Sequence, residues 1–112
     1  MKADCKKIYY FIGIGGVGMS ALARLCLKDG YSVYGYDKIS SEITDQLVKK
    51  GIKIIFDNSV SALNEILLSA EVQVIYSAAI PNSHPQLEFY KKQGNNVNKR
   101  AEFLAKICND KK

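Results

Sequence analysis

The sequence predicts an α/β fold, in which a parallel sheet carries helices on both faces. Five short β-rich runs alternate with segments whose apolar residues recur at helical spacing. The connections between them are short, as in sheets whose parallel strands are joined through helices. A glycine-rich segment, residues 13–18, stands between the first β-rich run and the first helical one. With right-handed crossovers, its position favours a Rossmann-like strand order, 3-2-1-4-5.

The first half of the chain is expected to hold three strands and two helices. The first strand covers the apolar run 8–12, and the first helix begins near Ala21 and ends at a glycine stop. The second strand covers 31–36, where β-branched and aromatic residues gather. A second helix begins at Glu42 after two serines, and a short apolar strand follows over 53–56.

The second half continues this alternation. It is expected to hold a helix over 60–67, a strand over 72–76, a helix from Pro85 to Gly94, a polar edge strand over 95–98 and a last helix from Arg100. The helix over 60–67 is inferred from the spacing of Val60, Leu63, Ile66 and Leu67. The last helix is expected to bury Phe103, Leu104, Ile107 and Cys108 and to fray from Asn109. His84, the only histidine, is expected in a solvated turn.

Size and composition indicate a single globular domain, residues 1–112. The net charge of +5 comes largely from lysines spread singly and in pairs, so a nucleic-acid partner is not expected. No apolar run approaches the roughly 20 residues of a membrane helix, and no signal-peptide core opens the chain, so we expect a cytoplasmic protein without a membrane partner. Three widely spaced cysteines support neither a disulfide framework nor a zinc site, and Cys26 and Cys108 are expected in the core.

The glycine-rich segment predicts a phosphate site. Gly13, Gly15 and Gly18 fit the pattern G-x-G-x-x-G between a strand and a helix. The first turn of a helix leaves backbone N–H groups unpaired and carries partial positive charge, and glycines let an anion approach those groups closely. Ser20 adds a hydroxyl that can donate to a phosphate or cap the helix. A tight turn without a ligand is the alternative.

Two further segments are expected beside this turn. Asp37 follows the second strand, and Ser77 follows the fourth, so in the predicted order both lie at the carboxyl edge of the sheet. An acid at this position can accept hydrogen bonds from a ribose diol, although Asp37 also suits an ordinary turn or cap. Ser77 can bond a phosphate or fill a tight bend.

The residues that carry these features resemble a known family, the amino-terminal domains of UDP-N-acetylmuramate:L-alanine ligases within the Mur ligase family. The resemblance rests on segments 11–20, 35–37, 76–80 and 100–102 and covers nearly the whole chain. It implies a site for the UDP part of UDP-N-acetylmuramate, formed by Gly15, Gly16, Val17, Gly18, Met19, Ser20, Asp37, Ser77, Ala78 and Ala79. Two departures are Asp57-Asn58, where many relatives have Gly-His, and Ala78, where they often have a second serine.

The resemblance also implies a reaction and further domains. In the family, ATP and magnesium convert the muramate carboxylate to an acyl phosphate, which the amine of L-alanine attacks. The ATP-binding residues belong to a central domain, and a carboxyl-terminal domain follows it. This sequence has no G-x-x-x-x-G-K-[ST], so we expect it to be the amino-terminal part of a longer ligase, to bind no cofactor or metal itself and to be inactive alone.

Three other interpretations remain open at this point. The related ligase that recycles murein peptides is the nearest, although it usually carries Cys and Phe among the glycines of this turn. A regulatory module that binds NAD(H) would use the same turn and Asp37. A domain that only binds another protein is the third.

Overall fold

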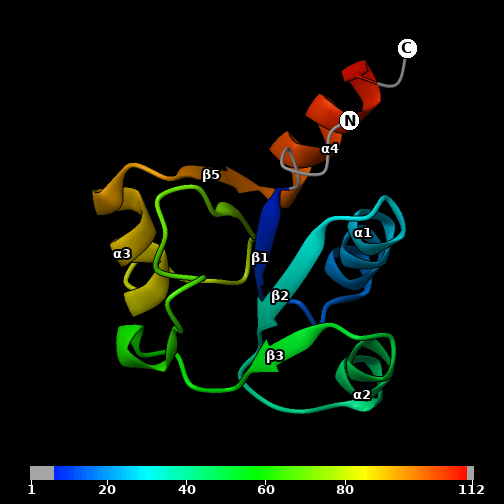
Figure 1. Cartoon of the computed structure of the whole chain (residues 1–112), viewed down its shortest axis with the longest axis horizontal. Coiled ribbons are helices and arrows are strands. Elements are labelled where there is room, and N and C mark those ends of the chain that lie inside the picture. Colours follow the sequence, from blue (N-terminus) through cyan, green and yellow to red (C-terminus); the bar gives the residue numbers. More distant parts are fainter. Residues whose placement is uncertain (1–6, 111–112) are drawn as a thin grey trace.

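A computed structural model describes residues 7–110, with side chains to residue 106, and shows one five-stranded parallel sheet. Its strands are β1 (Ile8–Ile12), β2 (Ser32–Tyr36), β3 (Lys53–Ile55), β4 (Gln73–Tyr76) and β5 (Asn96–Lys99). The order is β3-β2-β1-β4-β5, and all four neighbouring pairs are parallel (Figure 1). The predicted fold class and strand order are confirmed.

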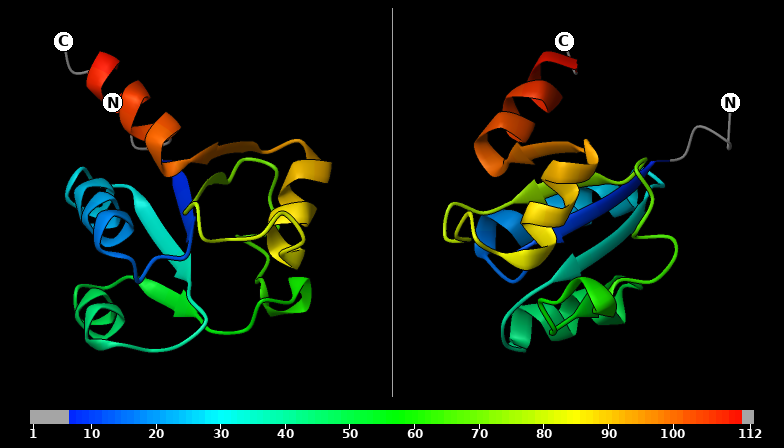
Figure 2. Two further views of the ribbon diagram at one scale, coloured as in Figure 1. Left: turned by 180° about the vertical axis from the view of Figure 1, so that it is seen from behind. Right: turned by 90° about the vertical axis from the view of Figure 1, so that its left-hand side faces the viewer.

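Helices cover both faces of this sheet, as predicted (Figure 2). They are α1 (Val17–Lys28), α2 (Glu42–Lys49), α3 (Pro85–Gln93) and α4 (Arg100–Asp110). The residues of β1 alternate between two cores, because successive side chains of a strand point to opposite faces. Tyr9 and Phe11 pack with residues of α1, α2 and α4, whereas Tyr10 and Ile12 pack with residues of α3.

The first helix begins earlier than expected. We predicted a start near Ala21, but α1 starts at Val17 and Gly16 is its N-cap, with extended backbone angles. The glycine-rich loop is therefore short, and the segment 17–20 forms the first turn of the helix. This shift matters for the site, because the unpaired N–H groups of a helix belong to its first turn.

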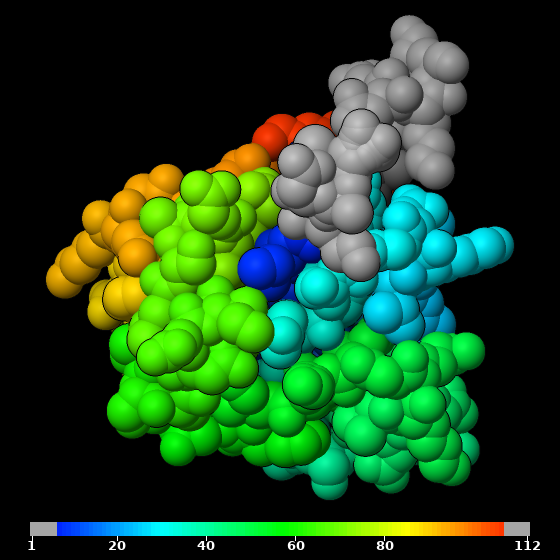
Figure 3. All heavy atoms as spheres, viewed as in Figure 1, coloured from blue at the N-terminus to red at the C-terminus, as the bar shows by residue number. Residues whose placement is uncertain are grey.

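The predicted helix over 60–67 is wrong. Only a short 3-10 helix, η2 (Val60–Ala62), forms there, and turns continue to the start of β4. The Asn64 side chain accepts a hydrogen bond from the Leu67 N–H at 2.9 Å and so offers the backbone an alternative to a helix. Leu63 and Leu67 are still buried. In Figure 3 this segment forms part of the green to yellow-green surface on the left of the molecule.

The predictions for Cys26 and for the last strand are confirmed in part. Cys26 is buried in the core as predicted, and burial raises the pKa of its thiol to about 12. β5 is an edge strand as predicted, but Asn95 lies before it, with its side-chain amide donating to the carbonyls of Ser69 and Val72. The expectations for the side chains of 107–110 and for residues 111–112 fall outside what the structure describes. Among the described residues, no helix is long and apolar enough to cross a membrane.

Candidate functional site

The glycine-rich loop is tied to the end of β2. The N–H groups of Gly13 and Ile14 both donate to the Tyr36 carbonyl, at 2.8 and 3.0 Å, and the Gly16 N–H donates to the Gly13 carbonyl at 3.2 Å. Gly13 has a φ of 92°, a region that favours glycine. Ile14 packs directly over Gly35, where a Cβ would collide with the Ile14 side chain. These hydrogen bonds and the packing of Ile14 therefore hold the loop against β2.

The first turn of α1 presents backbone N–H groups without protein acceptors. Within residues 7–110, no acceptor bonds the N–H of Val17, Gly18 or Met19, whereas the Ser20 N–H donates to the Gly16 carbonyl at 2.8 Å. The partial positive charge of the helix is concentrated in the same turn, and its first turn contains no acidic residue. This turn is a suitable place for an anion.

The side chains of this turn have other roles. Val17 is 79% exposed, while Met19 is 2% exposed and packs in the core. The Ser20 hydroxyl, also buried, donates to the Val17 carbonyl at 3.0 Å. It is therefore engaged inside the helix in this structure, and a ligand at this turn would meet the backbone rather than the Ser20 side chain.

Asp37 meets the loop directly. Its Oδ2 accepts a hydrogen bond from the Gly15 N–H at 2.7 Å, and its Oδ1 accepts one from the Lys38 N–H at 2.8 Å. A Cβ on Gly15 would lie 2.6 Å from Oδ2, so this contact requires glycine. Each carboxylate oxygen keeps further acceptor capacity after these bonds. The sequence interpretation placed Asp37 beside the loop but did not foresee that it would bind the Gly15 amide.

The turn after β4 forms the opposite side of the loop. The Ser77 N–H donates to the Ile12 carbonyl at 3.2 Å, and the Ser77 hydroxyl oxygen accepts from the Ala79 N–H at 3.3 Å. A Cβ on Gly13 would lie 3.0 Å from that oxygen, so the loop and the turn are in contact. Ala78 and Ala79 are exposed.

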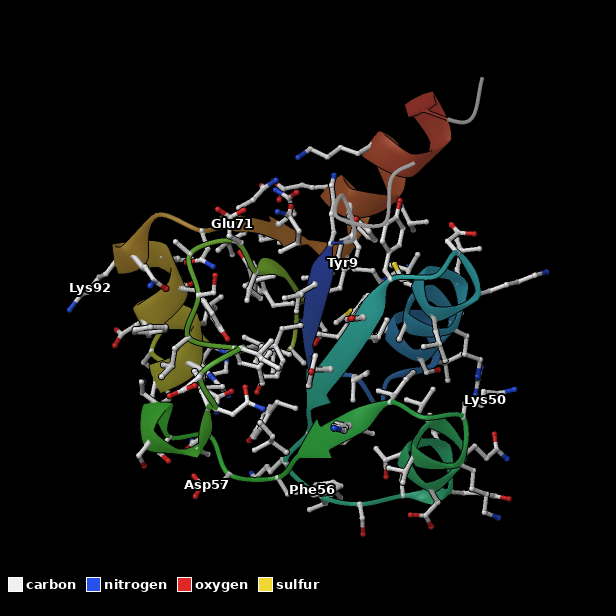
Figure 4. All side chains as sticks on the ribbon, viewed as in Figure 1. Tyr9, Lys50, Phe56, Asp57, Glu71 and Lys92 are labelled. Carbon is white, nitrogen blue, oxygen red and sulfur yellow. The ribbon has the colours of Figure 1, made fainter. Side chains whose placement is uncertain are left out.

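A cleft of about 540 Å³ opens between these segments. It is lined by Gly13, Gly16, Tyr36, Asp37, Lys38, Asn58, Ser77, Ala79, Ile80, Pro81 and His84. Asn58 comes from the connection after β3, and its neighbours in the chain, Phe56 and Asp57, are labelled in Figure 4. The structure thus brings Gly16, Asp37, Ser77 and Ala79 to one cleft, with the first turn of α1 next to it and the other candidate residues outside its lining.

His84 differs from its expectation. It is 6% exposed rather than solvated, and its ring packs edge-on against Tyr36, with the ring centroids 4.8 Å apart. Neither ring nitrogen has a hydrogen-bond partner among the described residues. Burial lowers the pKa of this imidazole, so it is neutral at pH 7. Its position before α3 suggested exposure, but its ring is buried against Tyr36 of β2.

Arg100 is a residue that we did not predict at this site. Its guanidinium contacts Gly18, because a Cβ on Gly18 would lie 3.1 Å from Arg100 Cζ, Nε and Nη1. Gly18 and Arg100 are 82 positions apart in the sequence (100 − 18), and only the topology of the fold brings them together. The sequence signal was present in segment 100–102, which carried the family resemblance without a role for Arg100.

A second cavity, of about 470 Å³, lies at the other ends of the strands. Its lining includes Lys7, Tyr9, Tyr31, Gln73, Asn96 and Phe103. It is separate from the loop and from the first turn of α1. Among the described residues, no group of three or more His, Cys, Asp or Glu side chains is placed to hold a metal ion.

Comparisons with known proteins give consistent results. A family model described as "Mur ligase family, catalytic domain" matches residues 8–112. The UDP-N-acetylmuramate–L-alanine ligase of Porphyromonas gingivalis is 42% identical over 102 residues, which are 90% of this chain and 22% of that protein. The enzyme of the same name from Christiangramia forsetii is 39% identical over 107 residues, 94% of this chain and 24% of that protein. The chain therefore spans less than a quarter of the length of these relatives.

Solved structures resemble the chain as well. The UDP-N-acetylmuramate-alanine ligase of Thermotoga maritima superposes with a TM-score of 0.82 at 28% identity, covering 95% of this chain and 23% of that one. The UDP-N-acetylmuramate:L-alanyl-gamma-D-glutamyl-meso-diaminopimelate ligase of Neisseria meningitides superposes with a TM-score of 0.78 over 91% of this chain and 31% of that one. At 22% identity, the second likeness shows a shared fold.

Proposed function

Because the chain belongs to the Mur ligase family, we propose that it binds the UDP moiety of UDP-N-acetylmuramate, within a peptidoglycan-precursor ligase that joins this substrate to L-alanine. The names of the relatives supply the substrate and the reaction. The observation that carries the proposal is the first turn of α1, where the N–H groups of Val17, Gly18 and Met19 have no acceptor among the described residues and lie beside a cleft. A diphosphate supplies the acceptors that this turn lacks.

The nucleoside is proposed to occupy the cleft. A volume of about 540 Å³ is within the range of small-ligand pockets. Asp37 stands at the carboxyl end of β2, with carboxylate lone pairs that can accept from ribose hydroxyl groups. Ser77 and Ala79 contribute to the lining of the same cleft, as does Gly16, the N-cap of α1. In this arrangement the chain binds and orients one substrate.

ATP and Mg²⁺, the other two groups that the family reaction needs, have no recognisable site among the described residues. The sequence contains no phosphate loop of the ATP-binding type, and the described residues contain no cluster for a metal ion. We therefore propose that ATP and Mg²⁺ act through parts of the ligase outside these 112 residues, and that the chain is the UDP-binding domain of that enzyme. The short share of each relative that it spans supports this proposal.

Isothermal titration calorimetry tests the proposal. The chain is titrated separately with UDP-N-acetylmuramate, UDP and NADH. Saturable binding of both uridine nucleotides without a response to NADH is the expected result. Saturable NADH binding without a response to UDP would instead assign the loop and Asp37 to a dinucleotide module.

A further inference from the structure

Arg100 lies where a bound diphosphate would need a positive charge, and we infer that its guanidinium binds the phosphates and favours UDP over uridine. This inference rests on the proposed function and adds to it a residue from the far end of the chain. The contact that motivates it is the close approach of the guanidinium to Gly18, in the first turn of α1.

The position of Arg100 is fixed by the topology. β5 ends at Lys99, which lies beside Tyr76 of β4, and α4 begins at the next residue without an intervening loop. The Glu102 side chain reaches back and accepts a hydrogen bond from the Lys99 N–H at 2.8 Å, which supports the start of the helix. Figure 2, in its left-hand view, shows α4 on the same side of the sheet as α1.

The charges around Gly18 favour the binding of an anion. A cation at the N-terminus of a helix is unfavourable, because the partial charge there is also positive. The guanidinium of Arg100 lies at such a helix N-terminus, beside Gly18. The first turn of α1 has no acidic residue, and no carboxylate among the described residues forms an ion pair with the guanidinium. A diphosphate would satisfy both the N–H groups and the guanidinium. Arginine suits this role because its planar fork of donors matches phosphate oxygens.

Binding titrations of three variants test the inference. Arg100→Ala is expected to weaken UDP binding about 10-fold or more, the usual cost of losing a hydrogen bond to a charged group, while uridine binding changes little. Arg100→Lys should lose less, since it keeps the charge but not the fork. Lys106→Ala is the matched control, because it removes a cation from the same helix at the opposite cavity and should leave UDP binding unchanged.

A double-mutant cycle with Gly18 strengthens the test. The added Cβ of Gly18→Ala meets the guanidinium at 3.1 Å and would displace this flexible side chain, so the effects of Gly18→Ala and Arg100→Ala on UDP affinity should not add. Circular dichroism and thermal unfolding check that each variant folds. If Arg100→Ala binds UDP as well as Lys106→Ala does, the inference is wrong while the proposed function stands. If the unmodified chain binds no UDP, the proposed function itself fails.

Discussion

Gly15 and Gly16 are neighbours whose side chains would have different consequences. A Cβ on Gly15 would lie 2.6 Å from Asp37 Oδ2, whereas the nearest atom to a Cβ on Gly16 is the Gly13 carbonyl oxygen at 3.7 Å. Gly15→Ala should therefore lower the free energy of unfolding by about 1–3 kcal/mol, the usual cost of forcing an atom into a packed site. Gly16→Val should keep the fold and abolish UDP binding, because its branched side chain extends into the cleft.

Urea unfolding and calorimetry with UDP separate these two effects. Unchanged UDP affinity in Gly16→Val would place the ligand away from the loop. Unchanged stability in Gly15→Ala would show that the Asp37 carboxylate moves aside without cost.

Individual residues of the site were predicted where the contact follows from strand order. Asp37 and Ser77 each follow a strand that neighbours β1, so a parallel sheet places both beside the loop. The contact of Arg100 with Gly18 depends on the exact path of α4 and on a flexible side chain, which no local pattern reports. His84 has the sequence setting of a turn, and its burial depends on Tyr36, from a distant strand.

Among the elements, α3 holds the connection after β3 in place through one side chain. Gln86 is wholly buried, and its oxygen accepts from the Tyr10 hydroxyl at 2.6 Å. Its Nε2 donates to the carbonyls of Asp57 and Ser59, both at 2.9 Å. These bonds fix the backbone on either side of Asn58, a residue of the cleft lining.

Replacing Gln86 by Leu should lower the free energy of unfolding by about 2–4 kcal/mol, because buried polar groups lose their partners. Gln93→Leu is the control on the same helix, since Gln93 is exposed and donates one hydrogen bond, to Leu68. Urea denaturation of both variants gives the comparison. Equal stability of the two would mean that water replaces the bonds of Gln86.

Elements were predicted well where periodicity and capping agree. α2 begins after Ser41, whose side chain forms a capping box with Thr44, and α3 begins at Pro85 and ends at Gly94 in the left-handed region. The segment 60–67 has the apolar spacing of a helix and follows Ser59, a residue type that caps helices, but the Ser59 side chain makes no cap hydrogen bond. In this segment the apolar spacing correctly indicates that Leu63 and Leu67 are buried. The backbone conformation is determined instead by hydrogen bonds that form turns.

At the scale of the whole molecule, His84 should make stability depend on pH. Burial lowers its pKa in the folded chain, whereas in the unfolded chain the pKa is near 6.5. The unfolded chain therefore takes up a proton first as the pH falls below 6.5. The free energy of unfolding should then decrease by up to about 1.4 kcal/mol per pH unit, until the pH reaches the lowered pKa.

Urea denaturation between pH 7.5 and 5 measures this dependence. His84→Phe keeps an aromatic ring against Tyr36 and removes the titrating group, so its stability should vary less over this range. Asp57 does not interfere, because hydrogen bonds from Ser59 lower its pKa and its effect falls at more acid pH. Parallel profiles for the two proteins would show that His84 takes up a proton equally well in the folded chain.

The position of the glycine-rich loop depends on Gly35, a residue inside the sheet. Ile14 can settle over β2 only because position 35 is bare, and the amides of α1 follow within a few residues of Ile14. Even an added methyl group there would lift the loop and change the direction in which those amides point. Position 35 is thus constrained although it lies outside the lining of the cleft, and in homologous chains positions 14 and 35 should vary together.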